Sequence, residues 1–164
     1  MGQFRTATAL LENHMTETTL APPWQLHSDR FVIRSAVTAI RNAFTHVGER
    51  QPMAFVPGER RATARIGLQI PVRLTAALVE QNAVWVERGF GSSIPATTLD
   101  ISLSGIGLSH SSPLASGYAL VRFEIPSEAI ICLVVQFAWT NHSADGKCTS
   151  GARILGVIDP EAAR

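Results

Sequence analysis

The stretch YALVRFEIPSEAIICLVVQFAW, residues 118–139, carries two β-strand signals in succession. Residues 118–125 alternate in hydrophobicity, a pattern typical of a strand with one buried face. Pro126 ends this strand because proline has no backbone N–H to donate. Residues 130–139 then form a long apolar run with several β-branched side chains, which predicts a second strand.

Similar signals extend from residue 66 to residue 158. Turn-forming residues, among them Gln81-Asn82, Pro113 and Asp145-Gly146, separate short runs of alternating or β-branched residues. The predicted strands cover residues 66–80, 83–87, 94–102, 105–109, 118–125, 130–139 and 149–158. Six or seven short strands at intervals of roughly 8–12 residues, without helices between them, predict a mainly β fold, either a small antiparallel barrel or a sandwich.

The first third of the chain has a different character. Residues 1–27 are rich in Thr, Pro and Ala and predict a flexible leader, since Pro22-Pro23 resists a helix. Residues 28–48 predict an amphipathic helix that Ser28 or Asp29 caps. Its apolar positions recur with gaps of three or four and are Ile33, Ala36, Val37, Ile40, Phe44 and Val47. This stripe has three alternative partners: the following domain, a second copy of the chain in a homodimer, or a neighbour in a longer protein.

Composition sets further bounds. The chain has 164 residues, of which 46% are hydrophobic and 16% charged, which describes a globular protein and not a disordered one. The formal net charge is only +1, yet residues 59–75 carry four arginines against Glu59 alone, a local net charge of +3. No run of about 18 apolar residues occurs, which argues against a transmembrane helix. Cys132 and Cys148 do not suggest a disulfide framework, so we expect a cytoplasmic protein with reduced thiols.

Catalytic patterns are absent from the sequence. Asp100, Ser102 and His110 lie close together in the chain, but Ser102 lacks the GxSxG elbow of a serine hydrolase. The five histidines have no metal-ligand spacing, and no phosphate-binding loop of the GxxxxGK type occurs. We therefore expect neither an enzyme nor a resident metal or cofactor.

The residue types suit ligand binding better. The segment ERRATAR, residues 59–65, contains Arg60, Arg61 and Arg65, and a guanidinium can bind phosphate oxygens in a bidentate manner or contact the O6/N7 edge of guanine. Asp100 accepts hydrogen bonds, which matches the N1–H and amine donors of guanine. Ser102, expected on the same strand face, can donate and accept, and Gly105 allows a close backbone approach. This set predicts an anionic ligand that carries guanine.

The two motifs resemble those of a known family. Residues 61–65 (RATAR) match RxxxR, and residues 100–105 (DISLSG) match [D/N]xSxxG. This pair, about 35 residues apart and followed by strands of a small barrel, is similar to the PilZ domain family of bacterial cyclic di-GMP receptors, over roughly residues 59–158. The resemblance implies that Arg61 and Arg65 hold phosphates and guanine Hoogsteen edges, that Asp100 and Ser102 bind the ligand, and that Gly105 shapes the bend. An arginine at position 60 implies a stacked pair of ligand molecules.

The resemblance also implies an organisation and a function. Residues 49–65 would form a linker that carries RxxxR, residues 66–158 a PilZ-like barrel and residues 159–164 a tail. The protein would bind cyclic di-GMP, use no other cofactor, and regulate a protein effector or a fused enzyme domain. Similar domains occur in bacterial cellulose synthase catalytic subunits. The alternative is a ligand-independent interaction module; a nucleic-acid polymer is disfavoured because exposed aromatic platforms along a basic groove are lacking.

Overall fold

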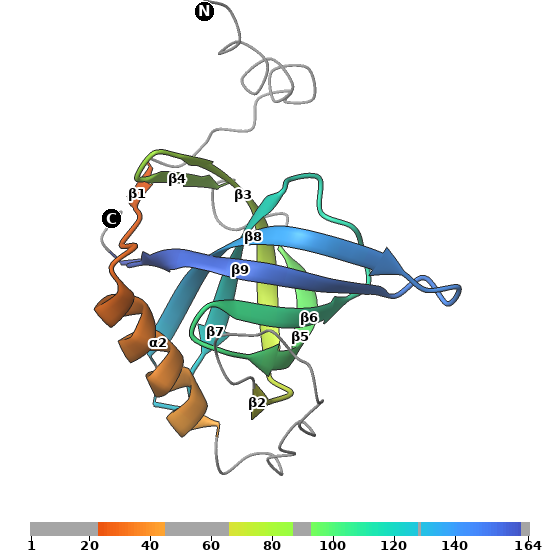
Figure 1. Ribbon diagram of the computed structural model, residues 1–164, viewed down its shortest axis with the longest axis horizontal. Coiled ribbons are helices and arrows are strands. Elements are labelled where there is room, and N and C mark those ends of the chain that lie inside the picture. The colour runs from red at the N-terminus through yellow and green to blue at the C-terminus, as the bar shows by residue number, and fades with distance from the viewer. Residues whose placement is uncertain (1–22, 45–65, 87–92, 128, 162–164) are drawn as a thin grey trace, which may run out of the picture.

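The computed structural model describes residues 23–44, 66–86, 93–127 and 129–161. The predicted leader up to residue 22, the linker with Arg60, Arg61 and Arg65, and the last residues of the predicted tail lie outside these ranges. Within them the chain forms one helix and nine strands (Figure 1). The elements are β1 (Trp24–Gln25), α2 (Arg30–Ala43), β2 (Ile66–Gly67), β3 (Pro71–Glu80), β4 (Ala83–Val86), β5 (Ile94–Ile101), β6 (Gly105–His110), β7 (Tyr118–Glu124), β8 (Ile130–His142) and β9 (Cys148–Ile158).

Six of the strands close into an antiparallel barrel in the order β3-β7-β8-β9-β6-β5. The barrel closes through β3, whose first residues pair with β5 and whose middle pairs with β7. The end of β3 continues past the barrel and forms a hairpin with β4 through the turn at Gln81-Asn82. The predicted mainly β fold, with a small antiparallel barrel preceded by a helix, is therefore confirmed, and the barrel has six strands.

The barrel interior holds the main hydrophobic core. Alternate residues of the wall strands face inward, for example Val121 and Phe123 of β7 and Leu133 and Val135 of β8, and each of these four is fully buried. This alternation is the pattern seen in the sequence of residues 118–125, since side chains on a strand point to opposite faces in turn. The core therefore forms from short apolar runs that are distant in the chain.

A second apolar cluster lies on the outside of the barrel. Leu120, Cys132 and Val134 face outward from β7 and β8 and are buried beneath Trp24 and residues of β4. Burial raises the pKa of the Cys132 thiol to about 12, which outweighs the opposing effect of the nearby Arg122 charge. The thiol is therefore protonated at neutral pH and acts as a small apolar group.

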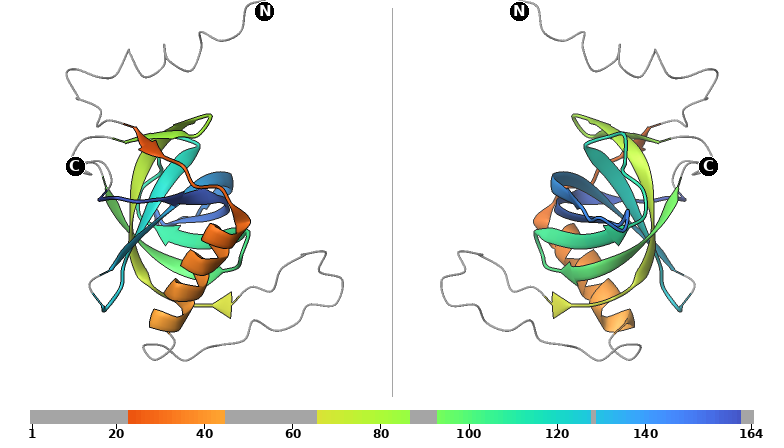
Figure 2. Two further views of the ribbon diagram at one scale, coloured as in Figure 1. Left: turned by 90° about the vertical axis from the view of Figure 1, so that its left-hand side faces the viewer. Right: turned by 90° about the vertical axis from the view of Figure 1, so that its right-hand side faces the viewer.

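The helix covers one opening of the barrel (Figures 1 and 2). Asp29 is its N-cap and accepts a hydrogen bond of 2.7 Å from the Phe31 N–H, as one of the two predicted caps. Ile33, Val37 and Ile40 belong to the same buried cluster as the inward-facing barrel residues. Of the three alternative partners for the stripe, the structure shows the following domain.

Two boundaries differ from those predicted. The helix ends at Ala43, because Phe44 leaves helical geometry as its C-cap, whereas the stripe had suggested an end near residue 48. Residues 24–27 are part of the folded body and not of a leader: Trp24 pairs with β4, and His27 exchanges backbone hydrogen bonds with Val157 of β9. Trp24 is only 7% exposed, so its burial fixes this short segment on the barrel.

The anchoring role of the helix stripe can be tested at Ile40, which is fully buried. We expect Ile40→Ala to lower the free energy of unfolding by about 2–5 kcal/mol, because it removes buried methyl groups and leaves a cavity. Phe31, 76% exposed on the same helix, is the control, and Phe31→Ala should change stability by less than about 0.5 kcal/mol. Urea unfolding of both variants measures the difference, and equal effects would contradict the anchoring role.

Candidate ligand-binding site

A β-bulge turns Asp100 to the outside of the barrel. In the pairing of β5 with β6 the register shifts between Thr98 and Asp100, so that Leu99 is the extra residue. Thr98 therefore faces the interior and is fully buried, while Asp100, two residues later, lies on the outer face opposite Gly107. Without the bulge, residues two apart on a strand would share a face.

Asp100 belongs to a row of directly paired residues that crosses five strands. Gly67 of β2 pairs with Asp100, Asp100 with Gly107 of β6, Gly107 with Gly151 of β9, and Gly151 with Trp139 of β8. Directly paired residues place their side chains on the same face of a sheet. The row therefore presents one carboxylate and one indole, separated by two glycines that have no side chain.

The glycines bring the carboxylate and the indole close together. A Cβ atom at Gly107 would lie 2.9 Å from Asp100 Oδ2, and one at Gly151 would lie 2.5 Å from Trp139 Cε2. The carboxylate thus lies over Gly107 and the indole over Gly151. Because paired positions on adjacent strands are about 5 Å apart, these two groups are neighbours. We call them the Asp100–Trp139 pair.

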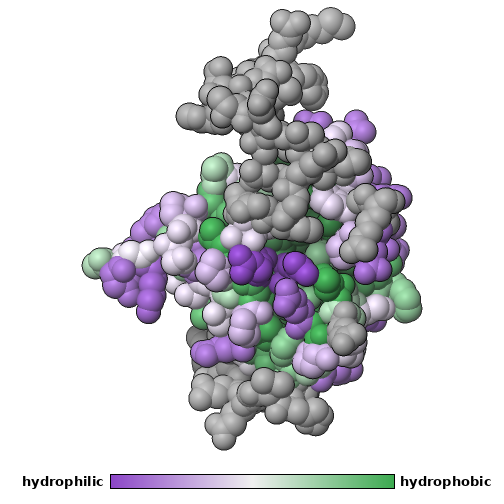
Figure 3. All heavy atoms as spheres, turned by 180° about the vertical axis from the view of Figure 1, so that it is seen from behind, coloured by the Kyte–Doolittle hydropathy of each residue, from purple (hydrophilic) through white to green (hydrophobic). Residues whose placement is uncertain are grey.

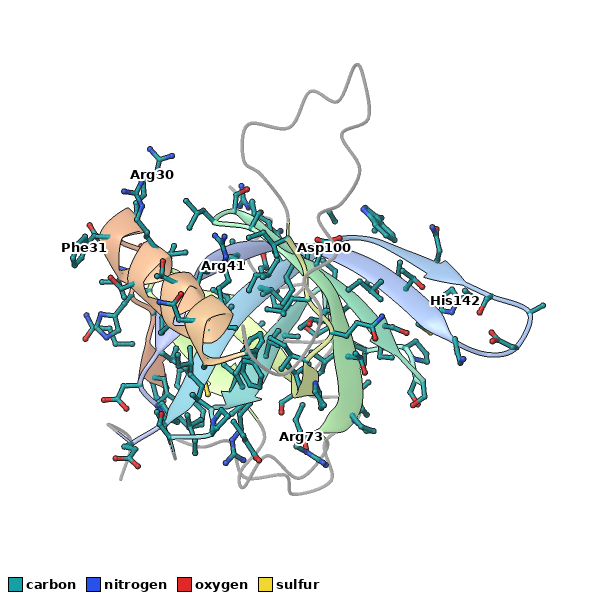
Figure 4. All side chains as sticks on the ribbon, turned by 90° about the horizontal axis from the view of Figure 1, so that it is seen from below. Arg30, Phe31, Arg41, Arg73, Asp100 and His142 are labelled. Atoms are coloured by element: carbon teal, nitrogen blue, oxygen red, sulfur yellow. The ribbon has the colours of Figure 1, made fainter. Side chains whose placement is uncertain are left out.

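The two members of the pair differ in exposure. Trp139 is 48% exposed, so its ring is open to solvent while it rests on Gly151. Asp100 is only 9% exposed, and a carboxylate at this depth is stable when donors surround it. In Figure 4 Asp100 lies on the barrel wall, apart from Arg73 and from His142 of the projecting hairpin. Together the pair offers a hydrogen-bond acceptor beside an aromatic surface.

The hydroxyl of Ser102 stabilises the turn between β5 and β6. It lies one residue beyond β5, not on the strand face shared with Asp100 that the sequence had suggested, and it is only 2% exposed. Its hydroxyl accepts hydrogen bonds from the N–H groups of Gly105, at 3.1 Å, and Ser104, at 3.3 Å. Ser102 thus holds the tight turn that leads into β6, and Gly105 begins that strand. A direct contact of Ser102 with a ligand stays a prediction.

The arginine segment itself lies outside the described residues, but the chain that follows it is placed. Ile66, which Arg65 precedes directly, pairs with Ile101, and Gly67 pairs with Asp100. The strand pairing thus brings the end of one sequence motif beside the start of the other. For Arg60, Arg61 and Arg65 the ligand contact remains a prediction.

Trp139 was not predicted to be a site residue, because in a regular strand it would face inward with Val135 and Phe137. A second register shift, between Phe137 and Trp139, turns the indole outward. One sequence signal could have pointed to it: Gly107 and Gly151 lie inside predicted strands, and a glycine inside a strand often marks a close approach.

A serine–histidine contact occurs inside the barrel mouth. His110 Nε2 lies 2.8 Å from Ser150 Oγ, and Thr140 Oγ1 lies 2.8 Å from the same oxygen. Ser150 is fully buried, so it is not an accessible nucleophile; the three side chains satisfy one another's hydrogen bonds. Among the described residues no group of His, Cys, Asp or Glu is arranged to hold a metal ion.

Comparison with known proteins found neither a matching protein-family model nor a matching curated protein. The part of the chain that the structure describes contains no helix with the length and apolar character needed to cross a membrane. The candidate site therefore depends on its own geometry and on the two sequence motifs.

The close contact at Gly151 predicts a clear effect of substitution. Gly151→Ala should displace the indole of Trp139, because the added methyl group would overlap the ring. We expect a shifted Trp139 indole N–H signal in NMR spectra. Gly117 is the control, since a Cβ there meets nothing within 4 Å, and Gly117→Ala should leave the signal unchanged. An unshifted signal in Gly151→Ala would contradict the described packing.

The role of Ser102 in the turn is tested by stability. Ser102→Ala removes the acceptor of two backbone N–H groups, so we expect unfolding to become easier by about 1–3 kcal/mol in chemical denaturation. The exposed Ser127 serves for comparison, and Ser127→Ala should have little effect. Equal stability of the two variants would argue against a structural hydroxyl at position 102.

Proposed function

We propose that the protein is a non-catalytic sensor that binds cyclic di-GMP, as the PilZ-like motifs imply. The observation that carries this proposal is the Asp100–Trp139 pair, in which an acceptor and an exposed aromatic ring are neighbours on the outer wall of the barrel. The strand that follows RxxxR pairs with Asp100, which supports a site shared by both motifs.

Each part of this ligand has a matching group. The N1–H and amine groups of guanine are donors, which the Asp100 carboxylate accepts. An aromatic side chain stacks on a base with a gain of about 1–3 kcal/mol, and Trp139 supplies such a surface. The phosphates require cations, which Arg60, Arg61 and Arg65 would provide through charge-assisted hydrogen bonds.

Binding would regulate a fused or partner protein through the helix. The arginine segment follows α2 in the chain, and Leu103, in the turn held by Ser102, packs against the core cluster that contains the buried helix residues. A ligand that orders the arginine segment on the barrel would favour one arrangement of the helix over another. The expected setting is the bacterial cytoplasm, with an output in exopolysaccharide synthesis, such as cellulose, or in motility.

Calorimetric titration tests the proposal. The wild-type protein should bind cyclic di-GMP and should bind cyclic di-AMP much more weakly, because adenine lacks the N1–H donor. Asp100→Ala should weaken cyclic di-GMP binding by about 1.5–3 kcal/mol, the worth of hydrogen bonds to a charged group. Asp145→Ala is the control, since Asp145 is an exposed carboxylate in the hairpin turn, bonded to Ser143 and Lys147.

Two results would count against the sensor. No heat from the wild-type protein at ligand concentrations on the order of tens of micromolar would exclude binding of useful affinity and favour the ligand-independent interaction module. Equal affinity for both cyclic dinucleotides would show that Asp100 does not distinguish guanine from adenine.

A further inference from the structure

Arg153 lies beside the Asp100–Trp139 pair. It is an exposed residue of β9, two positions from Gly151, and therefore on the same face of the strand. Its direct partners are Gly105 of β6 and Gln136 of β8. The row of Gly105, Arg153 and Gln136 thus runs next to the row that contains Gly151 and Trp139, about 7 Å away along the strand.

The guanidinium of Arg153 is held by a neutral group. Its Nη2 donates to Gln136 Oε1 at 3.3 Å, and Gln136 in turn lies beside Tyr118, whose hydroxyl is 3.5 Å from Gln136 Nε2. On the opposite side, Gly105 has no side chain. No ion pair of Arg153 with a carboxylate of the described residues is found. The positive charge is oriented and exposed, and no carboxylate of the described residues neutralises it, which is the condition under which a guanidinium binds a phosphate.

We propose that Arg153 binds a phosphate of the ligand held by the Asp100–Trp139 pair. This inference rests on the proposed function and extends it to a residue outside both motifs. A base stacked on Trp139 would hold its phosphate one sugar away, a reach comparable with the spacing of about 7 Å between the two rows. The barrel wall alone then provides an acceptor, an aromatic surface and a cation, and the site takes a phosphorylated purine nucleotide in preference to a nucleoside.

The test compares variants that keep or remove the charge. Arg153→Gln should weaken cyclic di-GMP binding roughly 10- to 100-fold and make the affinity less sensitive to salt, whereas binding of guanosine should not change. Arg153→Lys keeps the charge but loses the planar guanidinium group, so its affinity should lie between those of Arg153→Gln and the wild-type protein. Arg73→Gln is the matched control, because Arg73 is also an exposed strand arginine with one polar neighbour, Ser93, and lies apart from Asp100 (Figure 4).

The outcomes separate the two proposals. If the wild-type protein binds cyclic di-GMP and Arg153→Gln binds it as tightly as Arg73→Gln does, the role of Arg153 is overturned and the sensor remains. A lack of binding by the wild-type protein overturns both. Thermal unfolding of each variant shows whether a loss of binding comes from misfolding. If it does, the NMR signal of the Arg153 Nε–H group in the wild-type protein is the second test. This signal should shift when cyclic di-GMP is added and not when guanosine is added, and an unmoved signal overturns the role of Arg153.

Discussion

The structure depends on the pairing of β3 with two different strands. The first half of β3 closes the barrel against β5, and its middle continues the wall against β7. Closure lets the inward side chains of all six strands share one core and removes the unpaired edges that an open sheet would expose. The end of β3 leaves the wall, and with β4 it covers the outer apolar cluster. One ten-residue strand thus supports both cores.

Closure also fixes the surface on which the candidate site lies. The row from Gly67 to Trp139 crosses β2, β5, β6, β9 and β8, so its members come from segments far apart in the chain. Glycine weakens a strand because it has no side chain to pack. The space that a side chain would take at Gly107 and Gly151 is nevertheless occupied, by the Asp100 carboxylate and the Trp139 indole, respectively. The hydrophilic hairpin turn beyond β8 projects from the barrel (Figures 1 and 3). The pairing of β7 with β8 extends only as far as Gln136, so Trp139 lies beyond its end, on the side of this extension.

Much of the fold follows from local signals in the sequence, because alternation and turn residues act over a few positions. The strand predicted at residues 118–125 is β7 at Tyr118–Glu124, and Asp29 caps the helix as expected. The strand at residues 24–25 was missed, since it is too short to show a period and is fixed by tertiary pairing. The outward direction of Trp139 was missed for another reason: a bulge changes the alternation within β8, and the sequence signal for it lies in other strands, at Gly107 and Gly151.

The same packing limits how a ligand could act on the helix. Its buried stripe shares a rigid core with the barrel, so binding at the outer wall cannot move the helix by gradual deformation. A regulatory response requires two discrete arrangements that the ligand binds with different affinity. The turn at residues 102–105 connects the site to this core, since Ser102 holds its backbone and Leu103 packs inward. The differential affinity would come from the side chains that contact the ligand, and the turn held by Ser102 would transmit it.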